Sequence, residues 1–281
     1  MTNRIATFGA GIGYRRPLMN ALWADPSRVD VLEILTDGWM AAGGLTDLCE
    51  LAKTFTVTPH GVSLSLAGPG RPDPAYITRL AEIIDVVGAP YYSEHLAVTE
   101  IPGIDTGHLC PPVLSPTSLR QCVGNARTVQ SELGVPLAIE NITYTIALPS
   151  AGLDGPDFFA ELVEKADSLI LLDVTNLYIN SVNHRFDVAD YLDRIPLERV
   201  VHIHLAGGLT MHGKMVDSHS ELIGEEIWEL AGEVASRCRP ATVILEHDNN
   251  FPNPEVLLAE VDRARTLFFA DAAGTTRSHL P

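Results

Sequence analysis

A run near the end of the chain, VILEHDNN (Val243–Asn250), places three ionisable residues directly after an apolar stretch. In an extended strand, residues two apart share a face, so Glu246 and Asp248 are expected to point to one side and His247 to the other. Burying carboxylates without a partner costs free energy, so this strand end requires a nearby positive charge. A bound metal ion would supply that charge.

Residues of metal-ligand type also end several other apolar runs. They are Glu33, His60, Glu94, His95, Glu140, Asn141, Asp173, Asn176, His202 and His204. The segments between the runs add His184, Asp217 and His219. Imidazoles and carboxylates together form the ligand sets of zinc, manganese and iron. Because the candidates outnumber the roughly four to six ligands that one ion uses, the sequence predicts about two or three ions.

Several of these residues also have a purely structural interpretation. A single histidine in a strand is more often a hydrogen-bonded core residue than a ligand, and this applies best to His202. Glu33 and Glu94 fit ion pairs inside the fold equally well, and His247 should point away from the predicted ions. The convergence of many ligand types, rather than any one residue, favours a metal site.

Eight β-rich runs alternate with helical patterns and must position these side chains. The predicted strands cover 5–11, 29–35, 56–66, 90–98, 135–141, 168–174, 199–207 and 242–248, and the clearest helices cover 74–88, 115–134, 220–238 and 254–269. This alternation predicts a closed (β/α)8 TIM barrel, an α/β fold whose strand ends meet at one face. We expect a single domain over 1–271 and a flexible C-terminal tail over 272–281.

A doubly wound open sheet is the structural alternative. Its phosphate-binding turn would be GAGIGYRR (9–16), but the acidic residue expected after a second strand of that type is missing. The connection over 207–217 is long for a barrel loop and contains glycines, so we expect a mobile loop there. Asp217 and His219, at its end, are expected to bind the most labile ion.

Composition narrows the classes of function. The chain has 281 residues, 46% of them hydrophobic, and 36 acidic residues against 19 Lys and Arg give a net charge of −17. Such an acidic surface repels phosphates, so we expect no nucleic-acid partner. The four cysteines form no C-x-x-C pair, and no apolar run approaches the ~20 residues that cross a bilayer. We therefore expect a cytoplasmic protein that does not contact membranes.

Seven short motifs, in order along the chain, carry a resemblance. They are PHGVSLSL (59–66), SEHLAV (93–98), AIENIT (138–143), LLDVTNLYINSVNH (171–184), IHLAGG (203–208), VDSHS (216–220) and LEHDNNFP (245–252). Together they resemble the multinuclear non-heme iron-dependent oxidative enzymes, the family of the methanobactin biosynthesis oxidase. The resemblance implies a xylose-isomerase-like TIM barrel that holds two or three irons. It also implies a natural-product biosynthetic activity: dioxygen-dependent oxidation of a residue, often cysteine, in a ribosomally synthesised precursor peptide, aided by a small leader-peptide-binding partner protein.

The resemblance also assigns ligands and reveals departures. The implied iron ligands are His60, His95, Glu140, Asp173, Asn176, His184, His204, Asp217, His219 and Glu246, of which Asp217, His219 and Glu246 would be catalytic. The family often has a histidine where this chain has Gly208, and TDGW (36–39) replaces an expected Glu-Asn pair. Arg15 and Arg16 could hold a peptide carboxylate or be solvated.

Three rival functions remain open at the level of sequence. A divalent-metal-dependent sugar isomerase of this fold often has a lysine near the metals, and only Lys214 is expected near the ligand-bearing face. A phosphodiesterase or endonuclease fits the fold, but the net charge disfavours a DNA substrate. A degenerate barrel that only binds a partner is disfavoured by the number of ligand-type residues.

Overall fold

Apolar strands alternate with helices along the chain, and the strands close into a barrel in a computed structural model that describes residues 5–101, 104–146 and 150–270. All neighbouring barrel strands pair in parallel, in the order β1-β12-β9-β8-β7-β4-β3-β2. The strands are β1 (Gly9–Gly13), β2 (Val31–Leu35), β3 (Val57–Gly61), β4 (Tyr92–His95), β7 (Leu137–Glu140), β8 (Leu169–Asp173), β9 (Val200–Ala206) and β12 (Thr242–Glu246). The predicted (β/α)8 barrel is therefore confirmed. The tail predicted over 272–281 lies outside the described residues.

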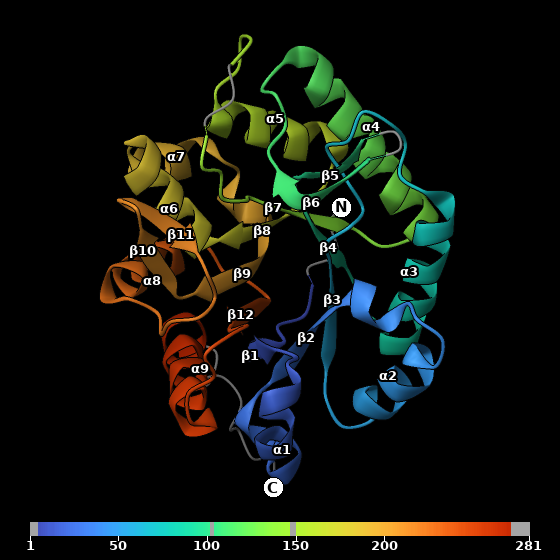
Figure 1. The fold of residues 1–281 in the computed structure, drawn as a ribbon, viewed down its shortest axis with the longest axis vertical. Coiled ribbons are helices and arrows are strands. Elements are labelled where there is room, and N and C mark those ends of the chain that lie inside the picture. The colour runs from blue at the N-terminus through green and yellow to red at the C-terminus, as the bar shows by residue number, and fades with distance from the viewer. Residues whose placement is uncertain (1–4, 102–103, 147–149, 271–281) are drawn as a thin grey trace, which may run out of the picture.

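Helices surround the barrel (Figure 1). They are α1 (Arg16–Ala24), α2 (Gly44–Ala52), α3 (Pro74–Val87), α4 (Pro116–Leu133), α5 (Gly155–Ala166), α6 (Val174–His184), α7 (Val188–Arg194), α8 (Glu225–Arg237) and α9 (Pro254–Phe269), with short 3-10 turns η1 (Pro26–Arg28), η2 (Thr36–Trp39) and η3 (Leu197–Arg199). Among the described residues, no helix is long and apolar enough to span a membrane.

Local sequence signals set the helix ends. The side chains of Asp73, Ser115 and Asn253 each accept a hydrogen bond from a first-turn amide, and a proline follows each of them. Gly88 and Gly134 end α3 and α4 in the left-handed conformation that glycine adopts without steric cost. The helix predicted over 220–238 begins later than expected, because α8 starts at Glu225.

The glycine run in β1 serves strand packing rather than phosphate binding. Gly11 pairs with Val31 of β2, and a Cβ on Gly11 would lie 1.8 Å from the Val31 carbonyl oxygen. Only glycine therefore allows these two strands to approach so closely. The open-sheet alternative, which interpreted this run as a phosphate turn, is wrong.

Two antiparallel hairpins extend the connections that follow β4 and β9. The first pairs β5 (Val98–Ile101) with β6 (Ile104–Cys110), and the second pairs β10 (Gly208–Met211) with β11 (Lys214–Asp217). The predicted strand over 90–98 therefore divides into β4 and the start of β5. The segment 207–217, expected to be a loop, is mostly an ordered hairpin whose turn residues His212 and Gly213 both have positive φ.

Candidate metal centre

The carboxylate of Glu140, at the end of β7, lies between three histidines from other strands. Its Oε2 is 3.2 Å from Nε2 of His60 and 3.3 Å from Nε2 of His95, and its Oε1 is 3.4 Å from Nδ1 of His204. Glu140, His60 and His204 are at most 1% exposed. Parallel strands deliver their carboxyl ends to the same face of a barrel, which explains why residues distant in sequence meet here.

A second group adjoins the first through His204. Glu246 Oε2 lies 3.1 Å from Nδ1 of His204 and 3.8 Å from Nε2 of His219, which is 2.8 Å from Asp217 Oδ1. Asp173 joins this group at the end of β8: ligand atoms of Glu140, Asp173, His204 and Glu246 all lie within 4.8 Å of one another. The two groups share Glu140 and His204, so they provide adjacent sites for a metal cluster.

Each of four histidines has one ring nitrogen held by the protein. Gly61 and Asp248 accept hydrogen bonds from Nδ1 of His95 (2.9 Å) and of His219 (3.0 Å). Ser93 donates its own proton to the Pro59 carbonyl, so its Oγ accepts from Nδ1 of His60 at 3.0 Å.

On His204 the opposite nitrogen is held, because Nε2 lies 3.0 and 3.1 Å from the two oxygens of Glu33. The remaining nitrogen of each of the four rings therefore faces the acidic centre, and in the neutral ring it would offer its lone pair to a metal ion. This is the arrangement that protein metal sites use to orient histidine ligands.

Unpaired polar atoms provide a test of whether this site fits metal ions. Within the described residues, several buried ligand-type atoms have no hydrogen-bond partner beyond the histidine–carboxylate contacts given above: Glu140 Oε2, Asp173 Oδ2, Asn176 Oδ1, His204 Nδ1, Asp217 Oδ1 and His219 Nε2. Burying such atoms unpaired is costly, and coordination to cations would satisfy all of them. The donor set, nitrogen and oxygen without sulfur, suits zinc, manganese or iron.

The pKa shifts within the site also indicate a place for cations. Burial would lower the pKa of His204, but Glu246, Glu33 and Glu140 surround the ring and raise it well above its ordinary value. Burial would raise the pKa of Glu246, yet His204 and His219 hold it well below its ordinary value. The histidines thus act as substitute cations for the carboxylates.

For Asp173, the compensation from His204 is smaller than the effects that oppose it. Burial, followed by the negative charges of Asp217 and Glu140, raises the pKa of its carboxyl group well above the ordinary value. Its Oδ1 accepts a hydrogen bond from the Asn176 amide, which caps α6, while Oδ2 is unpaired. A cation would stabilise the ionised form of this residue directly.

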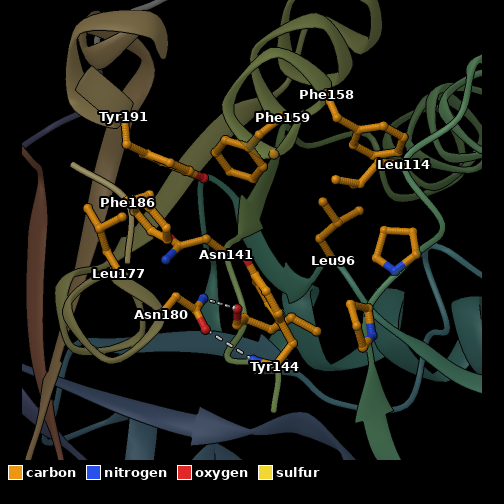
Figure 2. A pocket seen from close by; sticks show the side chains of 14 residues that line it. Leu96, Leu114, Asn141, Tyr144, Phe158, Phe159, Leu177, Asn180, Phe186 and Tyr191 are labelled. Carbon is orange, nitrogen blue, oxygen red and sulfur yellow. Dashed lines mark hydrogen bonds between the residues drawn. The ribbon is translucent and has the colours of Figure 1, made fainter. Parts of the chain in front are cut away.

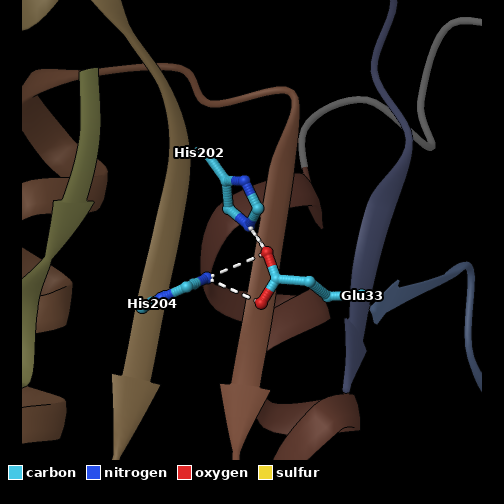
Figure 3. A group of neighbouring side chains, drawn as sticks. All are labelled: Glu33, His202 and His204. Atoms are coloured by element: carbon cyan, nitrogen blue, oxygen red, sulfur yellow. Dashed lines mark hydrogen bonds and ion pairs between the residues drawn. The ribbon is translucent and has the colours of Figure 1, made fainter. Parts of the chain in front are cut away.

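A deeper layer lies beneath His204. Glu33 on β2 contacts His204 and also His202, whose Nε2 is 3.4 Å from Glu33 Oε2, as Figure 3 shows. The other nitrogen of His202 lies 3.2 Å from the hydroxyl of Tyr91. The predicted common face of His202 and His204 is therefore observed, and Glu33 belongs to this layer as a partner of ligand candidates. Its place between polar residues of β9 was not evident from its own motif, VLEIL.

Among the other residues of ligand type, Asn176 lies at the edge of the candidate metal centre, and His184 and His247 lie outside it. Asn176 has an unpaired Oδ1 and lies at the start of α6 beside Asp173. His184, at the end of α6, donates through Nε2 to the Tyr144 carbonyl at 2.7 Å and stacks on the Tyr144 ring. It belongs to none of the groups of ligand atoms described above. His247 packs against Phe251, as its outward orientation predicted.

Arg15 was predicted either to hold a peptide carboxylate or to be solvated, and its side chain is only 16% exposed. Its guanidinium lies 2.6 Å from Oδ1 of Asp248, whose Oδ2 holds His219. The solvated alternative is therefore wrong, and peptide binding by Arg15 stays a prediction. Together, Arg15 and Asp248 fix the ring that faces Asp217 and Glu246.

Replacing Asp248 with asparagine is expected to weaken one bound ion selectively. The loss of negative charge loosens the hold on Nδ1 of His219, and such indirect changes typically lower metal affinity by about 10–100-fold. Metal per chain, followed during titration with a chelator, should show one ion leaving earlier than in the unmodified protein. Asp262→Asn, on exposed α9, serves as the control. An unchanged release profile in Asp248→Asn would show that the ring needs no such support.

The chain is similar to known proteins over nearly its whole length. The family described as RiPP precursor modification enzyme MbnB/TglH/ChrH matches residues 9–268. A UPF0276 protein of Streptomyces avermitilis is 36% identical over 280 residues, which cover 96% of this chain but 57% of that protein. A UPF0276 protein of Shewanella amazonensis is 33% identical and is covered over 97% of its length. The chain thus spans little more than half of the first relative and nearly all of the second.

Solved structures with the same architecture are more distant in sequence. Endonuclease IV from Thermus thermophilus aligns with a TM-score of 0.58 at 18% identity, over 92% of this chain and 98% of that one. An L-ribulose 3-epimerase aligns with a TM-score of 0.59 at 13% identity, over 99% and 100%. At these identities the likeness shows the barrel fold alone.

Proposed function

Because the chain belongs to the MbnB/TglH/ChrH family of RiPP precursor modification enzymes, we propose that it uses iron and dioxygen to oxidise one residue of a ribosomally made precursor peptide. The residue is a cysteine in this proposal, and a small leader-binding protein presents the peptide. The observation that carries the proposal is a set of four imidazoles, each held at one nitrogen by the protein and facing a carboxylate with the other. Three of them surround Glu140, and His219 faces Glu246.

The ligand candidates differ in their access to solvent, and this defines a side of approach. The side chains of His60, Glu140 and His204 are at most 2% exposed, whereas those of Asp217 and His219 are 18% and 16% exposed. The inner residues would hold their ions away from water. The outer pair would hold the ion that a peptide group reaches first, and that ion would exchange most readily.

Iron bound in this site would supply redox chemistry toward dioxygen and Lewis acidity toward a thiolate. The contribution of the protein is to hold the ligands, to orient the rings through Ser93, Gly61, Asp248 and Glu33, and to exclude water. Fixed ligands and a dry cavity increase the effect of every charge in the site.

The lysines argue against the sugar isomerase alternative. Lys53 and Lys165 pair with exposed glutamates, and Lys214, on β11, donates to the Asn183 carbonyl at 3.1 Å. None of the three is therefore paired with a ligand candidate, where a sugar isomerase of this fold often has a lysine.

The proposal is tested with protein purified without oxygen. Elemental analysis is expected to find iron as the main metal, at more than one ion per chain. Oxygen should be consumed only when the precursor peptide is present, and mass spectrometry should then show a changed mass at one residue. The same protein reloaded with zinc serves as the control and should leave the peptide unchanged. Full peptide modification by the zinc form, or magnesium as the only bound metal, would contradict the proposal.

A further inference from the structure

An aromatic cavity lies beside the candidate metal centre and has no part in binding metal. It has a volume of about 130 Å³, opens to the surface, and is lined by residues of α5, α6 and α7 and of the segments that follow β4, β6 and β7 (Figure 2). Rings of Phe158, Phe159, Phe186, Tyr144 and Tyr191 form much of its wall. None of the residues that line it is charged.

Apart from the hydroxyls of Tyr144 and Tyr191, the polar side chains in the wall are two asparagines, whose amides are occupied in holding the protein together. Asn180 accepts from the Tyr144 amide and donates to the Ile142 carbonyl, and both ends of the Asn141 side chain bond the backbone of Asp173. The cavity therefore offers an apolar surface rather than a polar binding site. An engineered apolar cavity of about 150 Å³ binds benzene, so a space of this size accepts one aromatic ring.

The cavity is joined to the metal centre by sequence adjacency. Three of its lining residues each follow a predicted ligand directly: Leu96 follows His95, Asn141 follows Glu140, and Leu177 follows Asn176. Successive Cα atoms are about 3.8 Å apart, so part of the cavity wall is built from the same segments that carry the predicted ligands.

Exposed apolar side chains stand near the cavity in sequence. Val113 lies between the lining residues Pro112 and Leu114 and is 47% exposed, and Ile146, close to Tyr144, is 76% exposed. Apolar groups exposed around an apolar hollow are typical of a binding surface.

We infer that this cavity binds an aromatic side chain of the peptide substrate, at a position next to the residue that is modified. The inference rests on the proposed function for its occupant, a peptide held at the metal centre. The aromatic wall favours a ring because offset and edge-to-face contacts add to the burial of apolar area. The cavity would thereby set both the register of the peptide and its sequence preference.

The test uses four synthetic dipeptides and the metal-loaded full chain under anaerobic conditions. The probes are N-acetyl-Phe-Cys-amide, N-acetyl-Cys-Phe-amide and the two corresponding alanine dipeptides, with affinities measured by calorimetry. At least one phenylalanine dipeptide is expected to bind about tenfold more tightly than its alanine counterpart. Equal affinities in both sequence orders would overturn the inference.

Two variants fill the cavity and one control does not. Gly155 lines the cavity and has open space where a Cβ would stand, so Gly155→Leu should reduce the phenylalanine preference to within about twofold. Metal content should stay unchanged. Leu114→Trp narrows the partly buried wall independently, and it decides the question if Gly155→Leu does not fold. Gly124→Leu, on an exposed face of α4 with equal open space, should keep the preference. Retention of the preference in both filled variants would overturn the inference.

A probe without a thiol separates this inference from the proposed function. Binding of 4-fluorotoluene to metal-free protein, followed by fluorine NMR, is expected and should disappear in Gly155→Leu. Absence of binding to the unmodified protein would overturn the cavity assignment. If the probe binds but serine dipeptides bind as tightly as cysteine dipeptides, thiol binding at the metal fails and the cavity assignment stands.

Discussion

Glu140→Gln is expected to lose bound metal and to lower peptide turnover by more than about 100-fold, beyond the range usual for residues that only support ligands. The Glu140 carboxylate lies between His60, His95 and His204, and it is shared by both groups of ligand atoms. Glutamine has nearly the same shape but no charge. Its NH2 group, which replaces one carboxylate oxygen, donates hydrogen bonds and does not bind a cation. The loss therefore reflects chemistry rather than packing.

Elemental analysis and turnover should be measured on the same Glu140→Gln sample, with circular dichroism to establish folding. Glu161→Gln is the matched control, because this residue lies on α5 in an exposed ion pair with Lys165. It should retain full metal content and turnover. Glu140→Gln with unchanged metal content would remove Glu140 from the ligand set.

Asp173→Asn is expected to change stability in opposite directions with and without metal. In metal-free protein the Asp173 carboxylate is buried beside Asp217 and Glu140, and these groups raise its pKa. Asparagine removes this repulsion and keeps an oxygen to accept from the Asn176 amide, so metal-free protein should become more resistant to unfolding.

In metal-loaded protein the same change removes a partner of the cation and should lower stability. A ligand present at a hundredfold excess over its Kd contributes about 2.7 kcal/mol to folding, and weaker binding reduces that contribution. Urea unfolding of both proteins, with and without a chelator, measures the four free energies. Asp167→Asn, an exposed residue, provides the control. The same sign of change under both conditions would show that Asp173 does not hold metal.

The barrel was predictable because each strand is a short apolar run that can be recognised from its local sequence. Runs such as SLILLDV have both faces buried, and Leu169–Asp173 is buried throughout. The β10–β11 hairpin was missed although its signal was present: His212-Gly213 between strand-like residues is a two-residue turn with positive φ. The glycine was interpreted as flexibility, whereas in this setting it fixes a turn.

The sequence indicated which residues are candidates for the site better than it indicated which of them contact one another. Two-residue alternation correctly placed His202 beside His204, since both contact Glu33. No sequence rule indicates that Arg15, at the start of the chain, meets Asp248 near its end, because barrel closure alone makes β1 and β12 neighbours. The position of His184 depends in the same way on a contact with the segment after β7.

The wall of the aromatic cavity comes from two kinds of segment. Leu96, Asn141 and Leu177 lie on segments that also carry ligand candidates, whereas Phe159 and Tyr191 lie on α5 and α7, which carry none. Substitutions in the segments that carry ligand candidates can disturb metal binding. Substitutions on α5 and α7 are expected to leave it unchanged. Divergence of peptide preference within such a family should therefore accumulate on α5 and α7, where new substrates can be explored at little catalytic risk.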